Sequence, residues 1–453
     1  MAPDTGAQDT GAPDTGAQDT RSARAVALTI LEEVLGRRRP LDDALAGNRA
    51  LAALSVRDRA FARRLVATLM RRLGQIDDLI ERCLERPLKP RLGGVRDLLR
   101  LGVAQLVFLE TPAHAAVSTT LDLARTPRLA GHKGLINAVL RRIAREGAVL
   151  VAEHDAARLN TPAWLWRSWC AAHGEATARA IAEAHLGDPP LDLSLRAGPG
   201  EAPDLEGWAA RLGARVLPTG SLRLPAGSGE VAKLPGYAEG AWWVQDAAAT
   251  LPPRLLAEVA GKRVLDLCAA PGGKTAALAM AGARVTAVEV SPARLARLEN
   301  NLARLGLEVE TVAADATRWR PAAPADAVLI DAPCIGTGTL RRHPDIARLK
   351  APADLAALTG LQDRLLAAAV EMTAPGGSIV FATCSLQPEE GAARIAALIA
   401  KGAPVERVPV DRAEVFGRAE WVSPEGDLRT LPCHLAEFGG MDGFYACRLR
   451  RLA

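Results

Sequence analysis

The stretch KRVLDLCAAPGGKT, residues 262–275, passes from an apolar run to a Gly-Gly turn and then into a helical pattern. This order predicts a buried strand that ends in a tight loop. Gly272 and Gly273 allow the backbone to approach a ligand closely, beside the exposed amides that start the next helix. The stretch is not a Walker A loop, because Cys268 stands where that pattern has its first glycine, and it does not give G-x-G-x-x-G. A plain Gly-Gly turn is the alternative to a ligand loop.

Five further apolar runs follow and alternate with segments of helical pattern. They lie at residues 283–290, 307–314, 326–333, 377–384 and 443–450. Between the first two runs, Ser291 is a predicted N-cap, Pro292 takes the first helical position and Gly306 stops the helix. The alternation predicts an α/β Rossmann-like domain at 245–453, with a mainly parallel sheet covered by helices on both faces. Ligands of such sheets bind at the carboxyl ends of the strands.

Acidic residues stand at the ends of successive predicted strands. Glu289 ends the second strand, Asp315 the third and Asp331 the fourth. Each alone is also explained as a helix cap, but together they predict a polar rim around one crevice. Glu289 lies where a carboxylate meets ribose hydroxyls in doubly wound folds. Because no phosphate-gripping pattern is present, we expect a nucleoside cofactor without a long phosphate chain, and S-adenosylmethionine is such a molecule.

Two of the seven cysteines end apolar runs: Cys334 in AVLIDAPCIGTG (327–338) and Cys384 in FATCSLQPEEG (381–391). Cytosine C5 is a poor nucleophile, but a thiolate that adds to C6 makes the ring enamine-like, so that C5 can attack a methyl group. A base must then remove the C5 proton before the thiolate leaves. The pattern predicts this covalent chemistry, with Asp331 and the backbone near Pro333 holding the polar edge of the base. Spacing alone does not say which cysteine attacks.

The composition of the chain is that of a cytosolic protein. The cysteines form no C-x-x-C pair and no histidine stands at ligand spacing, so we expect no metal site. The 453 residues contain no apolar run approaching the ~20 residues of a membrane span. The start of the chain is acidic, unlike a signal peptide. We therefore expect a cytoplasmic monomer without a membrane partner.

The first half of the chain divides into segments of different pattern. Residues 1–20 repeat a five-residue unit with four aspartates and predict a disordered tail. Removing those four charges from the formal +4 of the chain leaves +8, a mild indication of a nucleic-acid partner. Residues 21–148 have apolar residues at helical spacing and predict an all-α bundle with a basic surface. Residues 149–244 predict a helical linker and a small α+β subdomain of unknown role.

Within the helical block, the order of two segments is more specific than their composition. VRDLLRLGVAQLVFLETPAHAAVSTTLDLA (95–124) followed by HKGLINAVLRRI (132–143) resembles the NusB-like RNA-binding domain, in the version fused to bacterial ribosomal-RNA cytosine methyltransferases. The resemblance covers about 125 residues. It implies that this block contacts RNA.

The motifs of the C-terminal block carry a second resemblance. CAAPGGKT (268–275), DAPCIGTG (331–338) with RRHPDI (341–346), and ATCSLQPEEG (382–391) together resemble the Sun/Fmu family of S-adenosylmethionine-dependent RNA cytosine-5 methyltransferases. With the NusB-like block, the resemblance runs from about residue 21 to the end. It implies methylation of C5 of a cytosine in small-subunit (16S) ribosomal RNA.

The resemblance also implies roles for individual residues. Cys384 would be the nucleophile, and Cys334 would help to resolve the covalent adduct. Asp331 and Lys274 would reach the target cytosine. The cofactor would be surrounded by Cys268, Ala269, Ala270, Pro271, Gly272, Gly273, Lys274, Glu289, Asp315 and Asp331.

Several features leave alternatives open. Arg341 and Arg342 are candidate contacts to RNA phosphates, and a solvated surface turn is the alternative. The chain has Ile335 where the family usually has serine, and Gly391 where it usually has asparagine. A cytosine-5 methyltransferase of DNA or of another RNA is an alternative; in the DNA enzymes the Pro-Cys cysteine, here Cys334, attacks. A non-catalytic RNA-binding assembly factor is another alternative.

Overall fold

The structure, a computed structural model, describes residues 22–197 and 201–453. The chain divides into two compact units. The first holds the chain up to Leu69 together with Leu79–Ala148, and the second holds Met70–Asp78 together with Val149–Ala453. The expected tail at 1–20 lies outside the described residues. Residues 149–244, predicted as a segment of their own, share the second unit with the large α/β domain.

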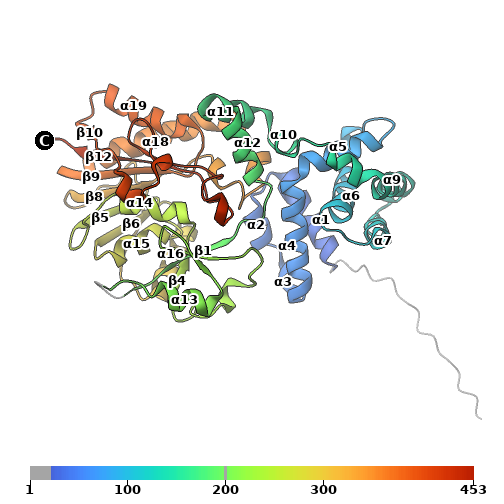
Figure 1. Cartoon of the computed structure of the whole chain (residues 1–453), viewed down its shortest axis with the longest axis horizontal. Helices are drawn as coiled ribbons and strands as arrows, with labels where there is room; N and C mark the ends of the chain where they lie inside the picture. The colour runs from blue at the N-terminus through green and yellow to red at the C-terminus, as the bar shows by residue number, and fades with distance from the viewer. Residues whose placement is uncertain (1–21, 198–200) are drawn as a thin grey trace, which may run out of the picture. The chain divides into compact units, whose positions relative to one another are not determined.

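The first unit is helical throughout its described residues, 22–69 and 79–148 (Figure 1). Ser22 caps the first helix by accepting the amide of Ala25. Apolar side chains at helical spacing are fully buried, among them Ile30, Leu65 and Leu98. The predicted all-α bundle is confirmed. The helices that lie wholly or partly in this unit are α1 (Ala23–Leu31), α2 (Leu41–Ala46), α3 (Arg49–Ala53), α4 (Val56–Arg71), α5 (Leu73–Cys83), α6 (Gly93–Val103), α7 (Ala113–Leu123), α8 (Pro127–Ala130) and α9 (Lys133–Ala152).

In the second unit, helices pack on the loops that follow the two cysteines. These helices are α10 (Ala156–Asn160), α11 (Ala163–His173) and α12 (Glu175–Ala184). Leu165 and Trp169 of α11 share one core cluster with Leu340, six residues after Cys334, and with Leu386, two residues after Cys384. The linker helices therefore support both cysteine loops.

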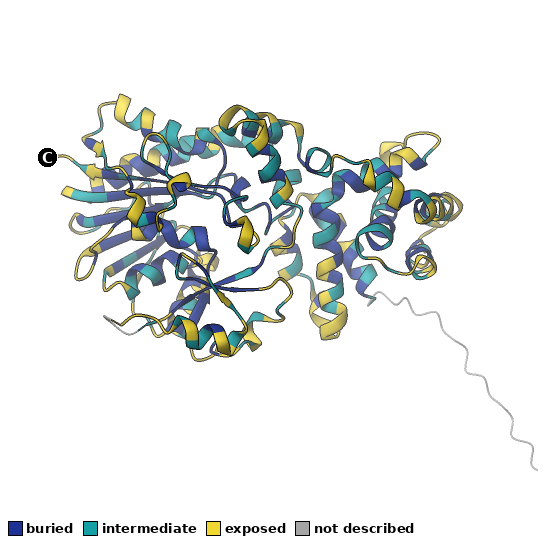
Figure 2. Ribbon diagram, viewed as in Figure 1, coloured by how far each residue is buried: buried dark blue, intermediate teal, exposed yellow. Residues whose placement is uncertain are grey.

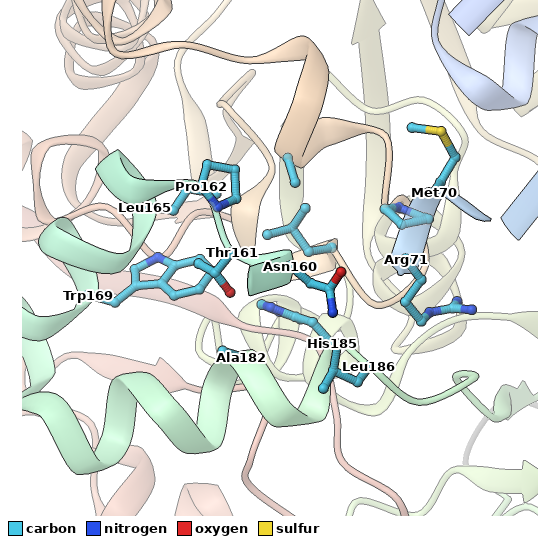
Figure 3. Close-up of a pocket in the computed structure, with 13 residues that line it drawn as sticks. Met70, Arg71, Asn160, Thr161, Pro162, Leu165, Trp169, Ala182, His185 and Leu186 are labelled. Atoms are coloured by element: carbon cyan, nitrogen blue, oxygen red, sulfur yellow. The ribbon is translucent and has the colours of Figure 1, made fainter. Parts of the chain in front are cut away.

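A small cavity lies among these helices. Figure 3 shows Trp169, Thr161, Asn160 and His185 around it. Its volume of about 30 Å³ accommodates water, whereas ligand pockets measure several hundred Å³. This cavity is therefore not a candidate cofactor site.

The small α+β subdomain has its own sheet, in the order β2-β3-β1-β4, with antiparallel pairing throughout. Its core contains Leu193, Leu222 and Trp242, with Trp208 packed against them. The predicted small α+β arrangement is confirmed. Its elements are β1 (Leu191–Leu195), α13 (Leu205–Leu212), β2 (Arg215–Val216), β3 (Leu222–Leu224) and β4 (Trp242–Val244).

The large sheet runs in the order β10-β12-β9-β8-β5-β6-β7, with β11 paired to β12. Strands β5 to β9 are parallel, and Leu267 of β5 lies between Val288 of β6 and Ile330 of β8. The last strand differs from the mainly parallel prediction, because β12 is antiparallel to β9, β10 and β11. The strands are β5 (Arg263–Leu267), β6 (Arg284–Glu289), β7 (Glu310–Ala313), β8 (Ala325–Asp331), β9 (Thr373–Thr383), β10 (Val405–Arg407), β11 (Leu428–Thr430) and β12 (Phe444–Arg451).

Helices cover both faces of this sheet, as predicted (Figure 1). Alternate strand residues enter different cores: Val264 packs with α14 and α15, whereas Leu265 packs with α18. Figure 2 shows the strands mostly in dark blue, because helices shield both of their faces. Burial on both faces is why these segments read as continuous apolar runs. The helices are α14 (Leu251–Arg254), α15 (Gly273–Met280), α16 (Pro292–Leu305), α17 (Ile346–Leu349), α18 (Pro352–Met372) and α19 (Ala392–Ala400).

Candidate active site

A candidate site lies at the carboxyl ends of β5, β6, β8 and β9. The chain runs outward from β5 to β6 and β7, then returns to β8 on the other side of β5. Such a switch point leaves a crevice in which ligands of doubly wound sheets bind. The register places Glu289 and Asp331 at this same edge.

The glycine loop, residues 268–273 after β5, is held in place by hydrogen bonds from side chains of α16. Arg294 donates a 2.7 Å hydrogen bond to the carbonyl of Ala270, and Asn301 donates one of 2.9 Å to that of Pro271. Gly272 has φ +101°, and a β-carbon there would lie 3.1 Å from Leu298, so the loop packs directly on α16. Burial raises the pKa of Cys268, which therefore stays a thiol.

The three acidic residues of the predicted rim, Glu289, Asp315 and Asp331, lie in different environments. Glu289 is 1% exposed; its Oε1 accepts the amide of Ser291, whereas its buried Oε2, 3.1 Å from Arg294, accepts no hydrogen bond. A ribose hydroxyl is a donor that would satisfy this oxygen, so the residues present fit a nucleoside cofactor. Asp315 is exposed beyond β7 and accepts from the amide and hydroxyl of Thr317.

Asp331 pairs with Lys274 across the crevice, with Nζ and Oδ2 2.7 Å apart. The ammonium also lies 4.9 Å from the centre of the Phe444 ring. Burial alone would lower the pKa of Lys274, but the Asp331 carboxylate outweighs it and the pKa is raised. Lys274 therefore remains a cation although it is buried, and it is suited to a polar or anionic edge of a ligand.

The loop that carries Lys274 also lines a pocket of about 390 Å³. The loop contributes Gly272, Gly273 and Lys274, and Asp331 joins them from β8. Trp243 and Tyr237 come from the small subdomain. The ion pair between Lys274 and Asp331 is therefore accessible from this pocket.

Cys334 and Cys384, in the loops after β8 and β9, are brought together, with their Sγ atoms 3.4 Å apart. Their loops are joined by hydrogen bonds from the Ala332 amide to the Ala382 carbonyl and from the Gly338 amide to the Cys384 carbonyl. The neighbouring Cys384 thiol and burial raise the pKa of Cys334 well above its ordinary value. The site thus places a protonated thiol, that of Cys334, beside a second thiol, that of Cys384.

The arginines proposed to meet RNA phosphates are bound to protein carboxylates instead. Arg341 is 1% exposed and bonds to Asp442 at 2.8 Å and Asp246 at 3.0 Å; Arg342 reaches the same two residues. Burial opposes ionisation of Asp246, but Arg342 and Arg341 hold its pKa below the ordinary value. Arg341 therefore does not lie in a solvated turn. The predicted contact of Arg341 and Arg342 with RNA phosphates stays a prediction, and protein carboxylates already bind both guanidinium groups.

We predict that Arg341→Met destabilises the protein by about 3 kcal/mol, because it leaves the buried carboxylates of Asp246 and Asp442 with one guanidinium instead of two. The free energy of unfolding in urea would measure this. The matched control Arg297→Met, at an exposed position of α16, should change it by less than about 0.5 kcal/mol. Equal effects of the two substitutions would contradict a stabilising role for the buried cluster.

Sequence reasoning missed a buried carboxyl group below the glycine loop. Asp266 of β5 is fully buried; its Oδ2 accepts the Thr275 hydroxyl at 2.6 Å, while Oδ1 accepts no hydrogen bond. Burial raises the pKa of Asp266 to about 7. An acidic residue within an otherwise apolar strand was the available signal.

The raised pKa of Asp266 predicts a pH-dependent stability. The folded protein favours the protonated carboxyl, so its stabilising contribution is lost as pH rises from about 4 to above 7. The unfolding free energy of the wild type minus that of Asp266→Asn should therefore fall between pH 5 and pH 8. Urea denaturation at both pH values tests this, and a constant difference would contradict it.

Two features of residues 22–197 and 201–453 bear on the class of protein. No helix in this part of the chain is long and apolar enough to cross a membrane. The same residues contain no group of three or more histidine, cysteine, aspartate or glutamate side chains arranged to hold a metal ion.

Comparison with known proteins identifies the family. Residues 253–450 match the family described as 16S rRNA methyltransferase RsmB/F, and residues 21–145 match the NusB family. The ribosomal RNA small subunit methyltransferase B of Vibrio cholerae is 34% identical over 441 residues, 94% of this chain and 96% of that protein. The chain belongs to the RsmB/F family of 16S rRNA methyltransferases. It is therefore an S-adenosylmethionine-dependent rRNA methyltransferase with an N-terminal NusB-like unit.

Solved structures agree with this fold. PH0851 shares 21% identity at a TM-score of 0.74, covering 95% of this chain and 98% of its own. A methyltransferase homologue from Pyrococcus horikoshii shares 26% identity at a TM-score of 0.51, over 63% of this chain and 94% of its own. The predicted fold class and cofactor are thus confirmed, whereas the roles of individual residues stay predictions.

Proposed function

We propose that this methyltransferase modifies C5 of a cytosine in small-subunit ribosomal RNA through a covalent bond between Cys384 and C6 of the base. The observation that carries the proposal is the pair of thiols 3.4 Å apart, next to the charged Lys274–Asp331 pair. Methyl transfer to an oxygen or an exocyclic nitrogen requires no thiol, whereas C5 needs nucleophilic activation at C6. The proposal places a monomeric enzyme in the cytoplasm.

The residues of the crevice would hold the cofactor. The loop from Cys268 to Gly273 offers backbone groups, Glu289 offers its buried Oε2, and Asp315 and Asp331 complete the rim. S-adenosylmethionine, when bound, supplies an electrophilic methyl group on a sulfonium. Lys274 and Asp331 would hold the polar edge of the cytosine so that C6 faces Cys384.

The protein side of the reaction has two steps. The Cys384 thiolate adds to C6, a C–S bond forms, and C5 becomes nucleophilic. After methylation a base removes the proton from C5, the C–S bond breaks, and its electrons return to sulfur as the thiolate. Cys334 is our candidate for assisting this second step, because its sulfur lies beside the one that leaves.

The product decides between this proposal and its alternatives. Unmodified 16S rRNA is incubated with the enzyme and methyl-labelled S-adenosylmethionine, then digested to nucleosides for mass spectrometry. We expect label in 5-methylcytidine, at one position in bisulfite sequencing. Label in another nucleoside, or preferential labelling of DNA of the same sequence, would overturn the proposal.

A further inference from the structure

We propose that Glu390 is a positioning residue that holds Cys334 against Cys384. This inference rests on the proposed function, because it assigns the two thiols to successive steps of one reaction. Glu390 lies on the single turn Pro388–Glu390, six residues after Cys384, and its side chain is fully buried. Its neighbour Glu389 is exposed, and no local pattern distinguishes the two glutamates.

The carboxylate of Glu390 contacts the Cys334 loop directly. Both of its oxygens accept the amide of Ile335, at 3.0 and 3.1 Å, and Ile335 follows Cys334 in the chain. On the other flank of Cys334, the carbonyl of Pro333 accepts a 2.8 Å hydrogen bond from Gln362. The same Gln362 amide donates to Oε1 of Glu390 at 3.1 Å. Both flanks of Cys334 are therefore tied to Glu390, one directly and one through Gln362.

Glu390 also contacts the chain beside Cys384. The Thr383 hydroxyl donates to its backbone carbonyl at 3.2 Å, and Ser385 favours the ionised form of its carboxylate. One residue thus contacts the chain next to each thiol. A buried carboxylate with this many partners is costly to replace, because each donor would lose its acceptor away from water.

The proposed reaction requires that Cys334 stay in a fixed position beside Cys384. If Cys334 assists departure of the Cys384 thiolate, it must keep its place while the base is bound to Cys384. A displacement of about 1 Å in a reacting group can cost on the order of 100-fold in rate.

Burial raises the pKa of Glu390, although its hydrogen bonds to Ser385, Ile335 and Gln362 oppose the shift.

The test compares Glu390→Ala and Glu390→Gln with the matched controls Glu389→Ala and Glu389→Gln in the full-length enzyme. For Glu390→Ala we expect turnover to fall about 100-fold with little change in the KM for S-adenosylmethionine. A denaturation-resistant RNA–protein complex should accumulate, because adduct forms and is not resolved. Glu390→Gln keeps one acceptor oxygen, so its turnover should fall less than that of Glu390→Ala. Both Glu389 variants should have the turnover of wild type.

A double-mutant comparison separates positioning from simple stabilisation. If Glu390 acts through Cys334, adding Glu390→Ala to Cys334→Ala should cause no further loss of turnover. The same fold-loss in both backgrounds, without accumulated adduct, would overturn the inference and leave Glu390 as a stabilising residue. If the alanine variant does not fold, Glu390→Gln carries the same comparison. Wild-type turnover in Cys384→Ala would show that the proposed function itself is wrong. That variant leaves Glu390 unchanged, so the two failures are distinguishable.

Discussion

Replacement of Cys384 by alanine is expected to lower methyl transfer to 16S rRNA by a factor of about 1,000 or more, because it removes the thiolate that the proposal assigns to the attack on C6. Binding of S-adenosylmethionine should be retained, since Cys384 lies at the end of β9 and the glycine loop follows β5. Methyl incorporation into rRNA measures the first quantity, and isothermal titration calorimetry the second.

The control for this prediction is Cys170→Ala, at another partly buried free cysteine on α11. Its turnover should match that of wild type. Residual turnover of Cys384→Ala above about a tenth of wild type would show that Cys384 is not the nucleophile.

Replacement of Cys334 by alanine is expected to have the opposite signature, with RNA accumulating in covalent complex with the protein. The nucleophile is intact in this variant, so addition and methylation proceed, but departure of the Cys384 thiolate is slowed. A gel run under denaturing conditions with labelled RNA measures the trapped fraction, which should rise from near zero to most of the enzyme.

The same trapping experiment tests the alternative taken from the DNA enzymes, in which Cys334 attacks the base. If Cys384→Ala traps RNA and Cys334→Ala does not, then Cys334 attacks and the assignments exchange. The distance between the two sulfur atoms is compatible with either order, so the trapping experiment decides it.

The sequence predicted the parts of this site that depend on local pattern. Strands β5, β6, β8 and β9 were found because both of their faces are largely buried, which makes them continuous apolar runs. The positions of Cys334, Cys384 and Asp331 followed from the ends of those runs. The antiparallel direction of β12 was not predicted, because a buried apolar run has the same composition in either direction.

The parts that sequence reasoning missed depend on partners far away in the chain. Arg341 looked available for a phosphate, but its carboxylate partners, Asp246 and Asp442, are 95 and 101 residues away. Glu390 and Glu389 are neighbours of the same type, and only folding buries one of them against the cysteine loops. Local sequence pattern therefore predicted where the site residues lie. Contacts between residues far apart in the chain determine which charged side chains are buried in ion pairs and hydrogen bonds.

The most direct test of the proposed chemistry is to identify the protein atom that carries RNA in the complex trapped by Cys334→Ala. The complex would be digested with protease and nuclease, and the cross-linked peptide sequenced by mass spectrometry. We predict a methylated cytidine nucleotide attached to the peptide that contains Cys384. A nucleotide on any other residue, or an attached cytidine without the added methyl group, would contradict the proposed order of addition, methylation and release.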